Sequence, residues 1–509
     1  MHSVIKISGG IARNPLYRFN QPVNMSINSD ECIAIVGDNG SGKSMLVDMI
    51  TGKHPLLNNE VEYDFHPSRF TKSYDNIKHI TFLDIYGTAE GIYYYQQRFN
   101  QTETDYYPTV KIIIDEAIAH AESRLNSESS ITPEQKEEIK RYRQDTFNKI
   151  YNLFDIQSIE KKRIIMLSSG EQRKLQLAKV LITAPRVLIV DNPFIGLDCE
   201  SRKLLFQLLY QIANDTKILL VLVFSKLDDI PDFVTHIIEV EDMCVKPKVK
   251  RQEWKNKYTD NSDHTLSPTL EQSILDLPYS DDDEFNSAII TGPIVKFEDV
   301  TIKYGNRIIF NNLTFSVNNG EHWAISGPNG CGKSTLLSII FADNPQAYYN
   351  NIILFGKKRG SGESIWDIKK HIGYVSPELH RGYLKNISAI NIVASGLKDT
   401  IGLYTKPKPE QMDICRFWMT AFGIGHHENT NFLHLSNGEQ RLVLLARAFV
   451  KDPSLIILDE PSHGLDMSNR RLVLDVVNAF CKRRNKSLIM VTHYENELPS
   501  IIDHKLLLS

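Results

Sequence analysis

Residues 37–44 read Gly-Asp-Asn-Gly-Ser-Gly-Lys-Ser, and residues 327–334 read Gly-Pro-Asn-Gly-Cys-Gly-Lys-Ser. Both stretches match the phosphate-binding loop pattern Gly-x-x-x-x-Gly-Lys-Ser. In such a loop the glycines let consecutive backbone N–H groups turn towards phosphate oxygens, the lysine neutralises charge and the serine hydroxyl binds Mg²⁺. The sequence therefore predicts two nucleotide sites in one chain. The expected contacts are Gly37, Asn39, Gly40, Gly42, Lys43 and Ser44 in the first copy, and Gly327, Asn329, Gly330, Gly332, Lys333, Ser334 and Thr335 in the second.

A second motif repeats further along the chain. Residues 167–173 read Leu-Ser-Ser-Gly-Glu-Gln-Arg, and residues 435–441 read Leu-Ser-Asn-Gly-Glu-Gln-Arg. Each motif is followed by an apolar run that ends in an aspartate, Asp191 or Asp459, and then by Gly-Leu-Asp at 196–198 or 464–466. The repeat period of about 270 to 290 residues is too long for a solenoid and is typical of two tandem domains.

This order of motifs resembles the nucleotide-binding cassette of the ABC ATPases, and the resemblance covers nearly the whole chain. It implies an α/β fold of two tandem P-loop NTPase domains, each with a RecA-like core, an antiparallel β edge and a helical subdomain. It also implies ATP and Mg²⁺ as ligands. Residues 359–375, from Arg359 to Val375, are similar to the ModF or photorepair-type (PhrA-like) proteins, which are soluble twin-cassette ATPases.

Composition narrows the class of protein. The 509 residues carry a formal net charge of −4, which argues against bulk electrostatic binding of nucleic acid, although residues 357–359 form a short basic run. The six cysteines include no Cys-x-x-Cys pair, so neither a zinc ribbon nor an iron–sulfur cluster is indicated. The apolar runs are shorter than the roughly 20 residues that cross a bilayer. We therefore expect a cytoplasmic protein, with a peripheral position at the inner face of the membrane as the alternative.

The predicted domain boundaries follow from local composition. The first cassette is expected to span residues 1–245, a flexible linker residues 246–293 and the second cassette residues 294–509. The linker prediction depends on low apolar content, the proline at 268 and the acidic run at 281–284. The aliphatic runs at 187–190 and 455–458 predict buried parallel strands. A helical insertion is expected between the phosphate-binding loop and the second motif of each half, with a charged helix near residues 133–143.

The resemblance assigns a role to each motif residue. In the family, two cassettes pair head to tail, so that the Leu-Ser-x-Gly-Glu signature of one faces the ATP held by the other. Asp191 and Asp459 would hold Mg²⁺ together with the loop serines, and Glu460 would act as general base beside His493 and Lys333. Tyr304 would stack on adenine, with an ordinary strand aromatic as the alternative. The signature residues expected at the γ-phosphate are Ser168, Gly170, Ser436 and Gly438.

The first cassette departs from this pattern. Asn192 follows Asp191 where Glu460 follows Asp459, and Ser225 stands at the spacing of His493. An amide cannot accept a proton at neutral pH, so the first site is expected to bind ATP and hydrolyse it poorly. The alternative is that another carboxylate, at position 228 or 229, replaces the missing base. No clear adenine-stacking aromatic precedes the first loop: an asparagine at position 14 aligns with Tyr304, and a tyrosine at position 17 fits only with a shift.

A third departure concerns the cellular role. Transporting ABC ATPases usually carry a glutamine after the strand at 372–375, and here Glu378 comes two residues after Ser376. The leading prediction is a soluble asymmetric ATPase that hydrolyses ATP mainly at its second site. One alternative is the ATP-binding subunit of a molybdate-type importer, which needs separate permease subunits as partners. Another is a ribosome-associated or DNA-repair-associated factor, although the chain lacks the long charged helical pair, zinc cysteines and coiled-coil insertions of such proteins.

Overall fold

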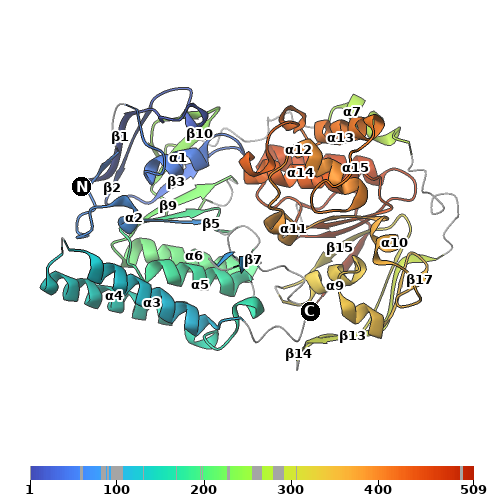
Figure 1. The fold of residues 1–509 in the computed structure, drawn as a ribbon, viewed down its shortest axis with the longest axis horizontal. Helices are drawn as coiled ribbons and strands as arrows, with labels where there is room; N and C mark the ends of the chain where they lie inside the picture. Colours follow the sequence, from blue (N-terminus) through green and yellow to red (C-terminus); the bar gives the residue numbers. More distant parts are fainter. Residues whose placement is uncertain are drawn as a thin grey trace. The chain divides into compact units, whose positions relative to one another are not determined.

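The computed structural model describes residues 2–57, 61–81, 87–88, 91–92, 107–129, 131–167, 169–194, 197, 199–225, 230–254, 266–278, 292–304, 307–328, 330–492 and 497–508 (Figure 1). The chain divides into two compact units. Unit 1 contains Met1–Gly87 and Glu103–Thr259, and unit 2 contains Thr88–Thr102 and Asp260–Ser509.

Unit 1 is built on a mainly parallel sheet with the strand order β11-β10-β3-β9-β8-β5. Neighbouring strands from β10 to β5 run parallel, whereas β11 and β12 pair antiparallel with β10. The strands are β3 (Ile33–Val36), β5 (Ile77–Thr81), β8 (Val187–Asp191), β9 (Leu219–Phe224), β10 (His236–Glu241), β11 (Cys244–Val245) and β12 (Val249–Lys250). A second, antiparallel sheet has the order β2-β1-β4, from β1 (Ser3–Gly10), β2 (Val23–Asn28) and β4 (Glu62–Tyr63).

The parallel sheet of unit 1 is buried on both faces, which explains its continuous aliphatic runs. Along β8, Val187 and Ile189 pack with the antiparallel sheet and helix α1 (Lys43–Ile50). Leu188 and Val190 point to the other face and pack with the remaining helices. These helices are α3 (Val110–Ser127), α4 (Pro133–Leu153), α5 (Ser169–Leu181) and α6 (Cys199–Asp215). The expected charged helical insertion is thus present as α3 and α4, which lie side by side (Figure 1).

Unit 2 repeats the same topology. Its parallel sheet has the order β18-β19-β20-β15-β21, from β15 (His322–Ser326), β18 (Ile372–Val375), β19 (Leu455–Asp459), β20 (Ser487–Val491) and β21 (His504–Leu507). Its antiparallel sheet has the order β14-β13-β16-β17, from β13 (Pro293–Tyr304), β14 (Arg307–Asn318), β16 (Asn351–Leu354) and β17 (Lys357–Lys358). In each unit a helix that begins at the loop lysine follows the first parallel strand; in unit 2 it is α9 (Lys333–Ile340). The predicted α/β fold class is confirmed.

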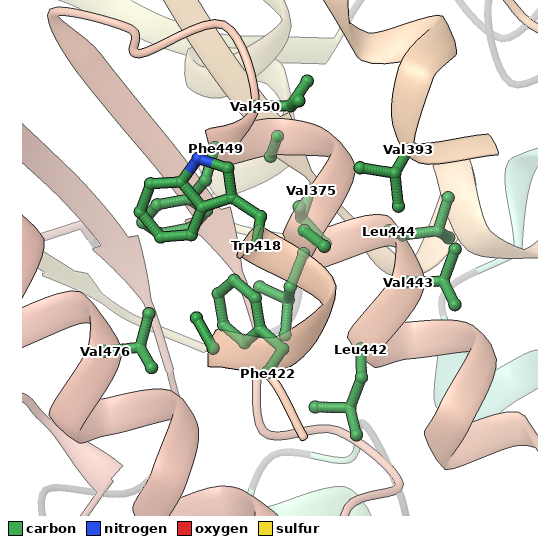
Figure 2. Packing of buried hydrophobic residues seen from close by; sticks show 14 of the residues in the cluster. Val375, Val393, Trp418, Phe422, Leu442, Val443, Leu444, Phe449, Val450 and Val476 are labelled. Carbon is green, nitrogen blue, oxygen red and sulfur yellow. The ribbon is translucent and has the colours of Figure 1, made fainter. Parts of the chain in front are cut away.

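The larger core of unit 2 lies between its parallel sheet and its helices. These helices are α11 (Pro377–Gly382), α12 (Ala389–Ser395), α13 (Pro409–Ala421), α14 (Asn437–Phe449) and α15 (Met467–Cys481), and a short α10 (Ile365–Lys369) precedes β18. Trp418 stands at the centre of this core, with its ring centroid 5.1 Å from that of Phe449 and 6.2 Å from that of Phe422 (Figure 2). The helical insertion of unit 2 is shorter than that of unit 1, because α12 has 7 residues and α13 has 13.

Parts of the expected linker carry structure. Strand β12 extends the sheet of unit 1 beyond the predicted boundary at residue 245. Helix α7 (Pro268–Leu275) packs against α15, with Ile274 fully buried, and Lys482 forms an ion pair of 2.7 Å with Glu271. The proline at 268 therefore begins a helix, with Ser267 as its N-cap, because its fixed φ suits the first turn. Residues 255–265 and the acidic run lie outside the described residues.

Among the described helices, none is both long and apolar enough to span a membrane.

Candidate functional site

The lysine of each phosphate-binding loop folds back onto the start of its own loop. Lys43 Nζ donates to the carbonyl oxygens of Gly37 and Asp38, at 2.8 and 2.7 Å. Lys333 Nζ donates to the equivalent pair in unit 2, at 2.7 Å to Gly327 and 2.9 Å to Pro328. Each ammonium group therefore lies inside the curve of its own loop. This is the position from which it contacts phosphate oxygens enclosed by the loop.

The residues of each loop fit a phosphate group. Gly42 and Gly332 are the N-caps of α1 and α9, with φ of 106° and 105°, a left-handed conformation that suits glycine. A Cβ at Gly332 would come within 2.8 Å of the Phe310 ring, so a larger residue does not fit there. Neither helix has a side-chain cap at its N-terminus. Both loops therefore lead into the positive end of a helix dipole, which favours an anion.

In unit 2 the carboxylate pair lies at the end of β19, beside β20. Asp459 is 6% exposed, and Glu460 follows it with a left-handed backbone, φ 48°. The Glu460 N–H donates to the Val491 carbonyl at 2.8 Å, which fixes the residue at the strand end. Burial raises the pKa of Asp459 well above its ordinary value, and Glu378 and Glu460 add to the rise, while Arg441 and Lys333 oppose it. A divalent cation would relieve this concentration of negative charge.

Arg441 supports the carboxylate pair from behind. Its side chain is fully buried, and one Nη donates to the carbonyl oxygens of Asp459 and Glu460, at 2.7 and 2.8 Å. Burial lowers the pKa of Arg441 to about 10 despite the nearby carboxylates. In unit 1, Arg173 also donates to the backbone beyond the strand end, but to the carbonyl of Pro193, the residue after Asn192. Neither arginine was among the predicted site residues, although an arginine at the end of both signature motifs indicates a shared structural role.

The equivalent position in unit 1 holds Asn192 instead of a carboxylate. Asn192 has φ 46°, and its N–H donates to the Val223 carbonyl at 2.8 Å, so its backbone matches that of Glu460. Its side-chain amide donates to Asp191 Oδ1 at 2.8 Å, and its side-chain oxygen accepts from the Ser225 N–H at 3.1 Å. Burial raises the pKa of Asp191 to about 6, while Lys43 and the Asn192 amide lower it. Asn192 thus ties the end of β8 to the end of β9.

The second signature forms the start of α14. Ser436 is the N-cap, its Oγ accepts from the Glu439 N–H at 3.4 Å, and Glu439 Oε2 accepts from the Ser436 N–H at 2.7 Å. Gly438 is buried in the first turn of this helix. In unit 1, Gly170 lies in the first turn of α5. The expected position of both signatures at a helix start therefore holds for the described residues.

The candidate adenine contacts are aromatic residues at the antiparallel edges. The Tyr304 hydroxyl accepts from Asn344 Nδ2 at 2.8 Å at the end of β13. In unit 1 the Tyr17 ring stacks on His54, with centroids 4.0 Å apart, while Phe19 lies against Gly42. The roles of Tyr304 and Tyr17 at adenine stay predictions.

Three predicted site residues and the alternative bases of unit 1 lie outside the described residues. These are Asn329, Ser168 and His493, together with Asp228 and Asp229. Apart from Tyr304, at the end of β13, the remaining predicted residues of each unit group at three places: the loop and first turn of α1 or α9, the end of β8 or β19, and the start of α5 or α14. The roles of individual residues in binding or catalysis stay predictions.

A family model and individual relatives identify the same protein family. The family described as ABC transporter matches residues 20–195 and 310–463. The ABC transporter ATP-binding protein ModF of Escherichia coli (strain K12) is 35% identical over 489 residues, which are 95% of this chain and 92% of ModF. The molybdate import ATP-binding protein MolC of Haemophilus influenzae is 30% identical over 201 residues, which are 40% of this chain and 73% of MolC.

A solved structure shows the same fold over the full length. The archaeal ribosome recycling factor aABCE1, in complex with the ribosomal stalk protein aP1, matches with a TM-score of 0.52 at 15% identity, covering 98% of this chain and 87% of that chain. At this identity the likeness concerns the fold alone. With two matches to one family, and with ModF aligned over both units, the chain belongs to the ABC transporter family as an ATP-binding protein with two cassettes.

Proposed function

We propose that the protein is an ATPase that binds Mg-ATP in both units and hydrolyses it mainly in unit 2. The observation that carries this proposal is the pair Glu460 and Asn192. The two residues share a left-handed backbone and the same strand-end hydrogen bond, but only Glu460 has a carboxylate that can accept a proton. The amide of Asn192 is moreover engaged on both sides, with Asp191 and with the Ser225 N–H.

The proposed chemistry of unit 2 assigns one task to each residue. Lys333 leaves the carbonyl oxygens of its loop to contact the phosphates, and the N–H groups at the start of α9 bind the phosphate oxygens. Mg²⁺, when bound with ATP, supplies positive charge to the phosphate oxygens. The Ser334 hydroxyl and Asp459 would hold that ion. Glu460 orients the attacking water and accepts its proton, and His493 assists at the γ-phosphate.

In unit 1 the same parts bind nucleotide without the base. Lys43, Ser44 and Asp191 keep their places, so affinity for Mg-ATP is retained. Without a proton acceptor, the attacking water is not activated, and hydrolysis falls by roughly 10² to 10⁴. In the family arrangement, two cassettes pair head to tail across two ATP molecules. We extend this arrangement to the present chain, with Ser436 and Gly438 at the nucleotide of unit 1 and the first signature at that of unit 2.

The test compares two matched substitutions in the full chain. Glu460→Gln is expected to lower kcat by about 10² or more while Mg-ATP still binds. Asn192→Ala is expected to change kcat less than threefold, because the remaining turnover occurs in unit 2. Phosphate release and nucleotide binding are measured on the same preparations. Equal loss of turnover in the two variants would contradict the asymmetric assignment.

A second candidate role is the ATP-binding subunit of a molybdate importer. The similarity to MolC, described as a molybdate import ATP-binding protein, favours this role. Glu378, in place of the glutamine usual in transporting relatives, weighs against it. Affinity purification of the tagged Glu460→Gln variant from detergent-solubilised membranes tests the idea. Recovery of a permease with the variant supports the importer role, and recovery without any membrane protein argues against it.

A further inference from the structure

Helix α11 connects the carboxylates of unit 2 with the helix that carries the second signature. It follows β18 directly and begins after Ser376, whose Oγ accepts from the Leu379 N–H at 3.1 Å. Glu378 pairs with Arg381 of the same helix at 3.3 Å, and its negative charge contributes to the raised pKa of Asp459. His380, two residues later, faces α14 instead. One short helix thus carries a charge that acts on Asp459 and a side chain that bonds to the signature helix.

The contact between His380 and α14 is a single defined hydrogen bond. His380 Nε2 lies 3.0 Å from Gln440 Oε1. The Gln440 amide nitrogen donates to the carbonyl oxygens of Phe432 and Leu435, both at 3.1 Å, so its oxygen is the acceptor and His380 Nε2 carries the proton. Burial lowers the pKa of His380 to about 4, and the charge of Arg441 contributes, so the ring is neutral near pH 7.

The same glutamine holds the loop that leads into the signature. Phe432 and Leu435 bound the turn directly before Ser436, and both carbonyl oxygens bond to Gln440. The next residue, Arg441, bonds to the backbone of the carboxylate pair. The bonds of His380 and Gln440 therefore give a shift of α11 a direct path to residues 432–436.

We propose that His380 is a positioning residue that transmits nucleotide occupancy of unit 2 to its own signature loop, residues 432–436. This inference rests on the proposed function, in which nucleotide and Mg²⁺ bind beside Asp459 and Glu378. Binding there changes the charge next to Glu378 and moves α11, and the His380–Gln440 bond carries the movement to the signature. Packed helices convert such small shifts into discrete rearrangements. The signature of unit 2 would then be ready for the nucleotide of unit 1 only when unit 2 is itself occupied.

The experiment measures hydrogen exchange of peptides covering residues 428–440 with and without Mg-ATP. The parent variant is Glu460→Gln with Lys43→Ala, which prevents hydrolysis and removes nucleotide from unit 1, so that any response must originate in unit 2. We expect Mg-ATP to slow exchange in this region at least fivefold, a change that corresponds to a coupling of about 1 kcal/mol. Adding His380→Leu is expected to abolish the response while Mg-ATP still binds to unit 2.

Two further variants separate positioning from simple packing. His380→Gln keeps an N–H donor for Gln440 and is expected to retain the response. Gln440→Leu removes the acceptor of the same bond. The double variant with His380→Leu should lose no more of the Mg-ATP-dependent slowing of exchange than either single variant, as expected for two partners in one interaction. A full response in His380→Leu, or no response in the parent, overturns the inference.

The outcome also separates this inference from the head-to-tail pairing. If Mg-ATP slows exchange of residues 428–440 in Glu460→Gln but not in Glu460→Gln with Lys43→Ala, the signature loop senses the nucleotide of unit 1. That result overturns the role of His380 and supports pairing of the units. If Mg-ATP slows exchange equally with and without Lys43→Ala, the result supports the role of His380 and gives no support to pairing of the units.

Discussion

Asp191→Asn should stabilise unit 1 in the absence of nucleotide. Burial raises the pKa of Asp191 from an ordinary 3.8 to about 6, even though Lys43 and Asn192 oppose the rise. At neutral pH the ionised Asp191 carboxylate is therefore less favourable in the folded unit than in the unfolded chain, and this difference lowers the free energy of unfolding. An asparagine at this position keeps an oxygen that accepts the hydrogen bond from the Asn192 amide and removes the buried charge.

The magnitude follows from the pKa. The rise corresponds to about 3 kcal/mol at 1.36 kcal/mol per pH unit, and because solvent reaches part of Asp191 we expect a gain of about 1 to 3 kcal/mol. Between about pH 4 and pH 6 the native state binds more protons than the unfolded chain, so the free energy of unfolding falls as pH rises. The penalty is complete above pH 6 and absent below about pH 4.

The assay is hydrogen exchange of the β8 amides, residues 187–191, converted to local free energies of opening. At about pH 7.5, Asp191→Asn should slow their exchange about 5- to 150-fold relative to the wild type, and at about pH 4 the two proteins should agree. Asp215→Asn, at the exposed end of α6, is the matched control and should show no difference. A gain of equal size at both pH values, or none at pH 7.5, would refute the electrostatic explanation.

Two further predictions concern unit 2. Trp418→Ala should lower the free energy of unfolding of unit 2 by about 3 to 5 kcal/mol in a denaturant titration, since Trp418 is 1% exposed at the centre of the core in Figure 2. Trp366, which is 53% exposed, provides the control variant Trp366→Ala in the same titration. Asp452→Asn should cost about 3 to 5 kcal/mol, because Asp452 pairs with Lys486 at 3.0 Å and with Arg483, and the substitution removes the negative charge that compensates these two buried cations. Asparagine still tolerates the left-handed backbone at 452, so a loss below 1 kcal/mol in thermal unfolding would contradict the charge argument.

The repeated motifs predicted most of the cassette architecture. The glycines and lysine at 37–43 and 327–333 specify the loop and the helix after it, because few other residues adopt its left-handed turns or offer its charge. The aliphatic runs before Asp191 and Asp459 predicted buried parallel strands, and both strands end at these aspartates. Local patterns were sufficient here because each motif combines its own backbone geometry and chemistry within a few residues.

The linker shows where local composition was insufficient. Low apolar content and the proline at 268 predict a flexible linker, but Pro268 begins α7, whose Ile274 is buried against α15. An eight-residue helix is marginal in isolation, so its stability depends on a partner more than 200 residues away in the sequence, which no local pattern reveals.

Residue identity at fixed spacing was enough to locate two phosphate-binding loops, two signatures and the difference between Glu460 and Asn192. The bonds of the other polar groups could be read only from the packed sheets and helices. The tertiary structure showed that Asn192 joins the ends of β8 and β9, that Arg441 supports the carboxylate backbone and that His380 reaches Gln440. These bonds link residues 33, 18 and 60 positions apart in the chain, and their geometry exists only after the sheet and helices have packed.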